Sequence, residues 1–250
     1  MKAVDSMLKQ GYWLFRYRSY LPLFLLVFVL GCLWFQRQIY ASENIWFDLI
    51  CLIIGLCGEF IRVMSVGFAP NRTSGRNTKH QLASEINQTG IYSLVRHPLY
   101  VGNFFMWLGI ALYTRIWWLV LIFVLVYWLY YERILMAEEN FLEGKFGDEY
   151  SIYSEKVPCI FPTFRNYVPN KYCFRIKKVL RQENSSLFGM IAVFLVLEFY
   201  QDLISYKNLL PERHWLVIGT IGLATYLVLR TLKKQTHVLH NDNQQQKSQA

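Results

Sequence analysis

The stretch that decides the fold is the hydrophobic run at residues 98–131, PLYVGNFFMWLGIALYTRIWWLVLIFVLVYWLYY. It holds two apolar segments, 98–113 and 116–131, which only Thr114 and Arg115 separate. A helix needs about 20 apolar residues to cross about 30 Å of hydrocarbon, and each segment is shorter than that. We therefore predict a tight helical hairpin within a membrane.

The composition of the whole chain agrees with this prediction. Of the 250 residues, 54% are hydrophobic, 17% aromatic and only 17% charged, which is typical of a membrane protein and not of a soluble domain. We predict an all-α, polytopic membrane helix bundle with about six transmembrane helices. The predicted spans are 21–39, 45–66, 98–113, 116–131, 186–206 and 215–232.

The basic residues predict the orientation of the chain. All but four of the 26 Lys and Arg residues fall on one side of the predicted spans. The four exceptions are Arg37, Arg115, Lys207 and Arg213. The positive-inside rule then places both termini in the cytoplasm, and we expect a bacterial inner-membrane protein. Attraction to anionic inner-leaflet lipids accounts for the net charge of +9, so no nucleic-acid partner is expected.

The chain divides into four predicted regions. Residues 1–44 form an uncleaved anchor with the first span, 45–162 a core, 163–232 a basic amphipathic segment with an extra helix pair, and 233–250 a disordered tail. The five cysteines show no metal-ligand spacing, so no metal is predicted.

Polar residues gather just before the hairpin. Arg96 and His97 precede Pro98, which suits the first turn of a helix and leaves His97 near the cap position. The exposed amides of a helix N-terminus attract anionic or electron-rich groups, and Arg96 adds a positive charge. The alternative interpretation is that both residues only anchor the helix at the lipid headgroups.

A second polar cluster follows the hairpin. Arg133, Glu138 and Glu139 return to the same membrane face, where carboxylates gain nothing from anionic lipid. They favour a cationic ligand, with solvated surface charges as the alternative. Glu59 and Arg62, three residues apart, are expected to form an ion pair in the same region.

Together the two clusters form a longer pattern. The first block is Gly90-x-Tyr92-x-x-x-Arg96-His97-Pro98-x-Tyr100-x-Gly102. The second is Glu138-Glu139-x-x-Leu142-x-x-x-Phe146-Gly147-x-x-Tyr150-x-x-Tyr153-x-x-x-Val157-Pro158. The pattern closely resembles the isoprenylcysteine carboxyl methyltransferase and phospholipid methyltransferase family, over about residues 45–162.

The resemblance implies an integral membrane methyltransferase that uses S-adenosylmethionine without a Rossmann domain, with the hairpin carrying the cofactor site. The cofactor-binding residues that it implies are Tyr92, His97, Pro98, Leu99, Tyr100, Glu138 and Glu139, with a weaker match at 84–87. Arg133 resembles the substrate-facing arginine of the family. Arg133 or Arg96 is therefore the predicted catalytic arginine, which would hold a carboxylate or phosphate of the acceptor. The acceptor is expected to be a membrane lipid or lipid-linked group: a carboxylate, a phosphate or a phospholipid amine.

The basic and aromatic segment at 163–181 suggests an acidic headgroup, or a basic helix on the membrane surface. Two other functions remain open from the sequence. A related membrane fold serves NADPH-dependent sterol-type reductases, which share an Arg-His-Pro-x-Tyr block, and a non-enzymatic membrane scaffold is the second alternative. The Glu138-Glu139 pair, followed by Phe-Gly and two tyrosines, favours methyl transfer.

Overall fold

The structure, a computed structural model, describes residues 2–35, 44–70, 83–165, 167–204 and 213–235, and these ranges contain helices and no strand. The predicted all-α fold is confirmed. The elements are α1 (Lys2–Tyr17), α2 (Leu21–Phe35), α3 (Ile45–Phe68), η1 (Gly90–Ser93), α4 (Pro98–Tyr113), α5 (Trp117–Phe146), α6 (Asp148–Lys156), α7 (Ile176–Ile204) and α8 (Arg213–Gln235). Most of the predicted tail, 236–250, lies outside the described residues.

Four of the described helices, α3, α5, α7 and α8, are long and apolar enough to cross a membrane. The helices α1 and α2, which meet at 81°, give a fifth span if they count as one. The helix α4 has 16 residues, which cover about 24 Å of a hydrocarbon layer about 30 Å thick. All six predicted segments are helical where they are described, but the count of six spans is not confirmed because α2 and α4 are short.

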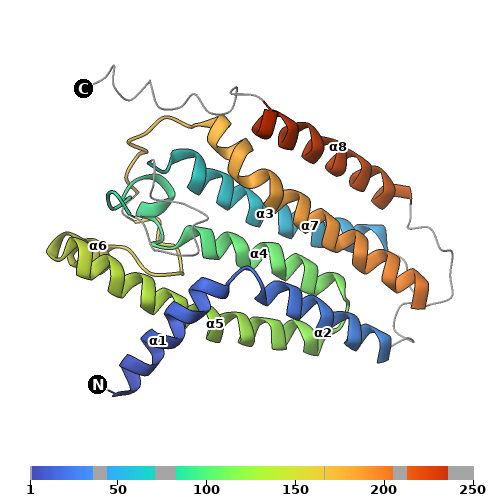
Figure 1. Ribbon diagram of the computed structural model, residues 1–250, viewed down its shortest axis with the longest axis horizontal. Coiled ribbons are helices and arrows are strands. Elements are labelled where there is room, and N and C mark those ends of the chain that lie inside the picture. Colours follow the sequence, from blue (N-terminus) through green and yellow to red (C-terminus); the bar gives the residue numbers. More distant parts are fainter. Residues whose placement is uncertain (1, 36–43, 71–82, 166, 205–212, 236–250) are drawn as a thin grey trace.

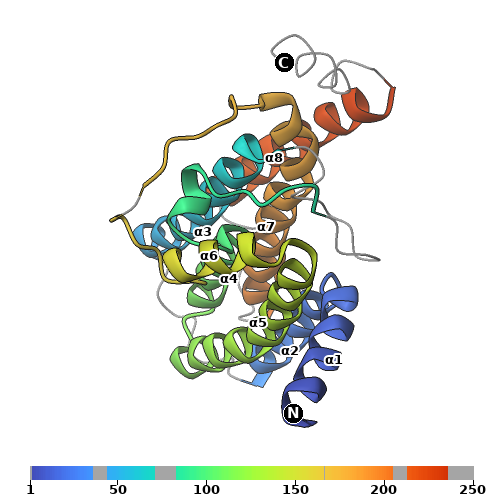
Figure 2. The same cartoon turned by 90° about the vertical axis from the view of Figure 1, so that its left-hand side faces the viewer.

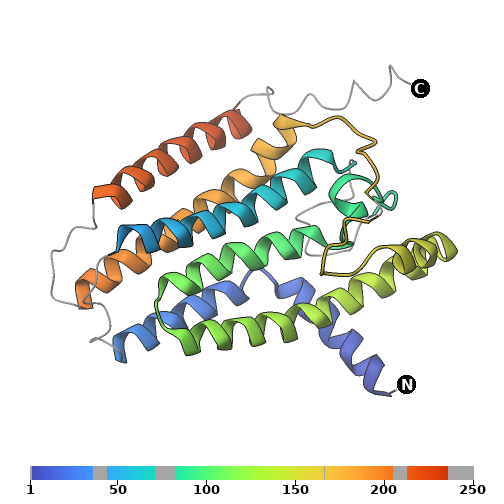
Figure 3. The same ribbon diagram turned by 180° about the vertical axis from the view of Figure 1, so that it is seen from behind.

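The helices α3 and α5 run in one direction along the bundle, and α4 and α7 run in the other (Figure 1). The C-terminal ends of α3 and α5 therefore lie at one end of the bundle beside the N-terminal ends of α4 and α7, and Figure 3 shows the same grouping from behind. We call this the polar end. The helix α5 continues past Tyr131, where its span was predicted to end, and carries Glu138 and Glu139 outward on a helical extension.

Glycines let α3 and α4 pack backbone against backbone. A Cβ atom added at Gly58 would overlap the carbonyl oxygen of Gly102 and lie 2.6 Å from the backbone nitrogen of Met106. One added at Gly109 would overlap the carbonyl oxygen of Cys51. Small residues are favoured at such interfaces because van der Waals packing holds membrane helices together. The contact fixes the start of α4 against the C-terminal half of α3.

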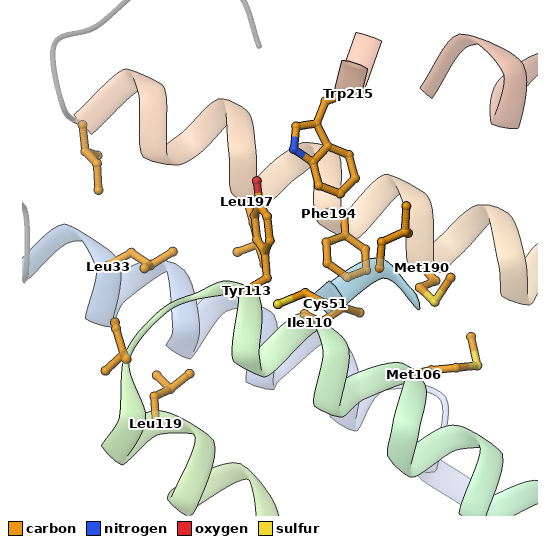
Figure 4. Packing of buried hydrophobic residues seen from close by; sticks show 13 residues of the cluster. Leu33, Cys51, Met106, Ile110, Tyr113, Leu119, Met190, Phe194, Leu197 and Trp215 are labelled. Atoms are coloured by element: carbon orange, nitrogen blue, oxygen red, sulfur yellow. The ribbon is translucent and has the colours of Figure 1, made fainter. Parts of the chain in front are cut away.

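The aromatic core lies toward the opposite end of the bundle (Figure 4). The ring of Phe194 lies 5.2 Å from that of Tyr113 and 5.3 Å from that of Trp215, between ring centroids. Tyr113 also donates a hydrogen bond to the buried carboxylate of Glu198. This cluster ties α4, α7 and α8 together away from the polar end.

The segment between α6 and α7 is an extended strap, defined as residues 157–165 and 167–175 (Figure 2). The surface helix considered for 163–181 is therefore helical only from Ile176 onward. The backbone of the strap pairs with the turn before α4 instead of with itself: Gly90 N donates to Val168 O at 2.8 Å, and Thr163 N donates to Leu94 O at 3.0 Å. The strap thus holds the residues that precede α4.

Candidate functional site

A cavity of about 740 Å³ opens at the polar end, between the ends of α3, α4, α5 and α7. Polar and aromatic side chains line the part near the start of α4, and apolar side chains such as Met106, Trp107 and Met190 line the part between α4 and α7. The predicted site residues that line it are Tyr92, Arg96, His97, Pro98, Leu99, Tyr100 and Glu138. Of the weaker strip at 84–87, the residues from Glu85 to Asn87 line it too.

His97 connects the two predicted clusters. It is the N-cap residue of α4, with Pro98 at the start of the helix, and it is 8% exposed. Its Nδ1 lies 3.4 Å from Glu138 Oε2, and its Nε2 lies 3.2 Å from Glu139 Oε1. The strap fixes the backbone at this point, because His97 N donates to Cys159 O at 3.3 Å.

Glu138 accepts a second strong contact from inside the cavity. The hydroxyl of Tyr100 donates to Glu138 Oε1 at 2.6 Å, and the guanidinium of Arg18 lies 3.9 Å from the same oxygen. The ring of Tyr100 packs at 4.7 Å from that of Tyr131. The carboxylate of Glu138 is therefore oriented by three groups and remains at the cavity wall.

Glu139 has a different environment, because it does not line the cavity. Arg96 Nη2 binds Glu139 Oε1 at 2.9 Å, and Arg96 Nη1 donates to Ser154 O at 3.1 Å. Arg96 is the implied catalytic arginine that lines the cavity, and this ion pair holds its guanidinium toward α5 and α6.

In the described part of the chain, one group of side chains has the composition of a metal site. Ligand atoms of His97, Glu139 and Cys159 lie within 4.8 Å of one another. Burial, with the nearby charge of Glu139, raises the pKa of the Cys159 thiol to about 11. A bound cation would have to displace both this proton and the charge of Arg96.

Arg133 does not line the cavity and lies on the side of α5 that faces α1. Its Nε donates to Gln10 on α1 at 3.1 Å, and its Nη1 donates to Glu132 at 3.1 Å. Five residues along a helix correspond to a rotation of about 140°, so Arg133 and Glu138 lie on different faces of α5. The face that carries Arg133 is the one that contacts α1.

Two charged residues that line the cavity were missed by the sequence analysis, Glu183 on α7 and Arg18 in the turn after α1. Arg62 pairs with Glu183 at 2.6 Å, and its distance to the predicted partner Glu59 is 3.8 Å. It also donates to Asn103 at 2.5 Å. Glu183 lies in the polar first part of α7, before the predicted span at 186–206, and its sequence neighbourhood gave no signal that set it apart.

The environment of His97 makes stability depend on pH. Burial by itself lowers the pKa of His97, but hydrogen bonds and charge from Glu138 and Glu139 outweigh burial and raise it above its usual range. The stabilisation from a raised pKa is complete below about pH 6.5 and is lost as the pH rises through the folded-state value.

We therefore expect the melting temperature of the purified protein to fall as the pH rises above about 6.5. The test is thermal unfolding in detergent over a pH series. The His97→Gln variant should show a smaller fall because it cannot bind the proton. Equal slopes for the two proteins would contradict this explanation.

The fold and the cavity define a polytopic helical membrane protein with a polar site at one end of its bundle. Residues 49–149 match the family model described as phospholipid methyltransferase. The resemblance expected from the two blocks is thereby confirmed, and the matched range contains His97 and Glu138. The helices α1, α2, α7 and α8, together with the strap, lie outside it.

Individual relatives match about half of the chain and carry two kinds of name. Over 147 residues the chain is 33% identical to the protein-S-isoprenylcysteine O-methyltransferase of Schizosaccharomyces pombe, covering 54% of this chain and 57% of that protein. It is 29% identical over 120 residues to the nickel-cobalt-cadmium resistance protein NccN of Alcaligenes xylosoxydans xylosoxydans, covering 48% and 54%. It is also 29% identical over 140 residues to the cobalt-zinc-cadmium resistance protein CzcN of Cupriavidus metallidurans, covering 56% and 61%.

The chain thus spans about half the length of the curated relatives that it matches. No solved structure matches it.

Proposed function

We propose that this protein is an integral membrane methyltransferase that moves a methyl group from S-adenosylmethionine to a lipid or lipid-linked acceptor. The observation that carries the proposal is the cavity, whose polar part holds His97, Tyr100 and Glu138 and whose other part is apolar. A polar donor and a hydrophobic acceptor can meet in such a space. The isoprenylcysteine O-methyltransferases among the relatives support the same reaction class.

The polar part of the cavity has groups suited to S-adenosylmethionine. The ammonium and ribose hydroxyl groups of this molecule are hydrogen-bond donors, and the carboxylate of Glu138 is an acceptor at the cavity wall. Tyr92 and Tyr100 provide aromatic walls, while His97 and Tyr100 orient Glu138. The cofactor supplies a methyl group on a sulfonium, which is an electrophile with a built-in leaving group.

The reaction requires alignment more than acid–base chemistry when the acceptor is a carboxylate or phosphate. A bond forms between the acceptor oxygen and the methyl carbon as the carbon–sulfur bond breaks, and sulfur keeps the electron pair. The protein contributes position and exclusion of water. An amine acceptor would also need a base, and Glu138 or His97 is the candidate inside the cavity.

The basic residues place the cavity on the cytoplasmic face in this proposal. The polar end carries the termini of α1, α3, α5 and α7 where most of the Lys and Arg residues gather. We propose a bacterial inner membrane as the location. A soluble donor would then enter from the cytoplasm, while the acceptor enters from the surrounding lipid.

The proposal is tested by feeding a radiolabelled methyl donor to membranes with and without the protein, and then separating the lipids and prenylated proteins. We expect label in one of these fractions only when the protein is present. Binding of the labelled donor to purified protein should saturate, and NADPH should not compete with it. Label in neither fraction, or competition by NADPH, would defeat the proposal.

A further inference from the structure

The chain bends sharply between α1 and α2, outside the range of the family match. We call residues 18–20 of this bend the elbow; the two helices meet there at 81°. Arg18 and Ser19 line the cavity from the elbow, and Pro22 and Leu23 continue that wall into α2. An element beyond the shared core therefore completes the site.

Packing against α5 fixes the elbow in place. A Cβ atom added at Gly11 of α1 would overlap the carbonyl oxygen of Arg133 and lie 2.9 Å from the Cβ of Ala137. One turn later, the buried side chain of Phe15 packs with Tyr130 of α5. Because α1 lies this close to α5, the position of Arg18 relative to Glu138 is set by tertiary structure.

Aromatic residues indicate the depth of the elbow in the membrane. Trp13, Tyr17 and Tyr20 surround it, and their side chains are exposed on the outside of the bundle. Trp and Tyr are enriched at the level of the lipid headgroups, where their apolar and polar parts are both accommodated. The elbow therefore lies at the depth where an anionic headgroup would enter the cavity.

Arg18 has the chemistry and the orientation for such a group. Its guanidinium stacks over the ring of Phe15 at 4.0 Å, and it lies 3.9 Å from Glu138 Oε1. A guanidinium presents a planar set of donors that matches a carboxylate or phosphate in a bidentate manner. Stacking on an aromatic ring limits the freedom of that fork, and Arg18 lines the cavity.

We propose that Arg18 binds the anionic headgroup, a carboxylate or phosphate, of the methyl acceptor. This inference rests on the proposed function, in which Glu138 receives the ammonium or ribose hydroxyls of the donor. The Arg18–Glu138 pair then separates the two substrates, with the donor on the carboxylate and the acceptor on the guanidinium. In this proposal the acceptor is held from the elbow, outside the range of the family match.

The two other arginines that line the cavity form close ion pairs with carboxylates. Arg62 is held by Glu183 at 2.6 Å, and Arg96 by Glu139 at 2.9 Å. The first pair joins α3 to α7, and the second joins the turn before α4 to α5. Recruiting either arginine to a substrate would therefore break a contact between elements. Arg18 lies farther from its carboxylate, at 3.9 Å from Glu138 Oε1, and that carboxylate is the one assigned to the donor.

The test compares wild type with Arg18→Gln, Arg18→Lys and Arg16→Gln. Arg16 is a matched control because it carries the same charge two residues earlier, on the last turn of α1, and is exposed outside the cavity. The probes are tritiated N-acetyl-S-farnesylcysteine, its neutral methyl ester, and phosphatidic acid in phosphatidylcholine nanodiscs. The two acidic probes distinguish a carboxylate from a phosphate source.

Removing a charged hydrogen-bond partner should weaken binding of an acidic probe by about tenfold or more in Arg18→Gln. Arg18→Lys should lose less, because it keeps the charge and lacks the fork. We expect Arg16→Gln to bind like wild type and the methyl ester to bind all variants equally. Because Arg18 also lies near Glu138, Arg18→Gln should lose some affinity for S-adenosylmethionine, but less than it loses for the acidic probe.

The inference is overturned if wild type binds neither acidic probe. It is also overturned if Arg18→Gln binds an acidic probe as strongly as wild type does, or if Arg18→Gln and Arg16→Gln lose the same affinity for it. A loss of methyl-ester binding equal to that of the acid would do so as well. If wild type binds an acidic probe through Arg18 but does not bind S-adenosylmethionine, the proposed function fails and this inference is reduced to an anion site.

Discussion

Replacing His97 by alanine should weaken binding of S-adenosylmethionine by about a hundredfold or more and abolish methyl transfer. The imidazole lies between Glu138 and Glu139, at 3.4 Å and 3.2 Å. Without it Glu138 would lose one of the three groups that orient it and keep only Tyr100 and the more distant Arg18, while Glu139 would keep Arg96. Glu138 would then no longer offer an oriented acceptor to the donor.

The measurement is equilibrium binding of labelled S-adenosylmethionine to purified protein in detergent. His214→Ala is a suitable control because His214 lies at the start of α8, toward the opposite end of the bundle. His97→Gln should keep part of the binding, since an amide can still donate to one carboxylate. Donor binding by a folded His97→Ala variant at wild-type strength would exclude this role for His97.

Replacing Gly58 by alanine should destabilise the bundle by about 3 kcal/mol. The added methyl group would overlap the carbonyl oxygen of Gly102, and backbone atoms cannot rotate out of the way as a flexible side chain can. The helices α3 and α4 would have to separate, which would also move the start of α4 and the cavity wall. The corresponding fall in melting temperature is about 6–12 °C for a chain of this size.

Gly31→Ala provides the matched control, because a Cβ atom at Gly31 of α2 meets nothing within 4 Å. The same chemical change should there be neutral or stabilising, since alanine favours a helix over glycine by about 0.5–1 kcal/mol. Thermal unfolding of both variants in the same detergent compares them directly. Equal melting temperatures would show that the close contact between α3 and α4 does not hold the bundle together.

The sequence predicted the apolar helices but neither α1 nor the extended strap. Hydrophobic runs predicted the apolar segments of α3, α4, α5, α7 and α8, because membrane spans require long apolar stretches. The helix α1 was not predicted: it has no long apolar run, and packing of Phe15 and Gly11 against α5 stabilises it. The extended strap was not predicted either, because its backbone hydrogen bonds join it to residues about 70 positions earlier in the chain.

The candidate site was likewise predicted only in part. The sequence brought His97 and Glu138 to one face, since a short hairpin returns its second helix to the starting side of the membrane. The sequence did not show that Glu138 lines the cavity, whereas Glu139 pairs with Arg96. Adjacent residues on a helix point about 100° apart, and neighbouring elements decide which direction is the cavity.

The sequence by itself determined the membrane class, the hairpin, and the family resemblance carried by residues 90–102 and 138–158. These features are local or periodic, so they can be recognised along the chain. Only the tertiary structure decided that Arg133 faces α1, that Glu183 binds Arg62, and that Arg18 reaches the cavity. Each of these contacts joins helices far apart in sequence, and their geometry depends on how closely the helices pack, which no single segment specifies.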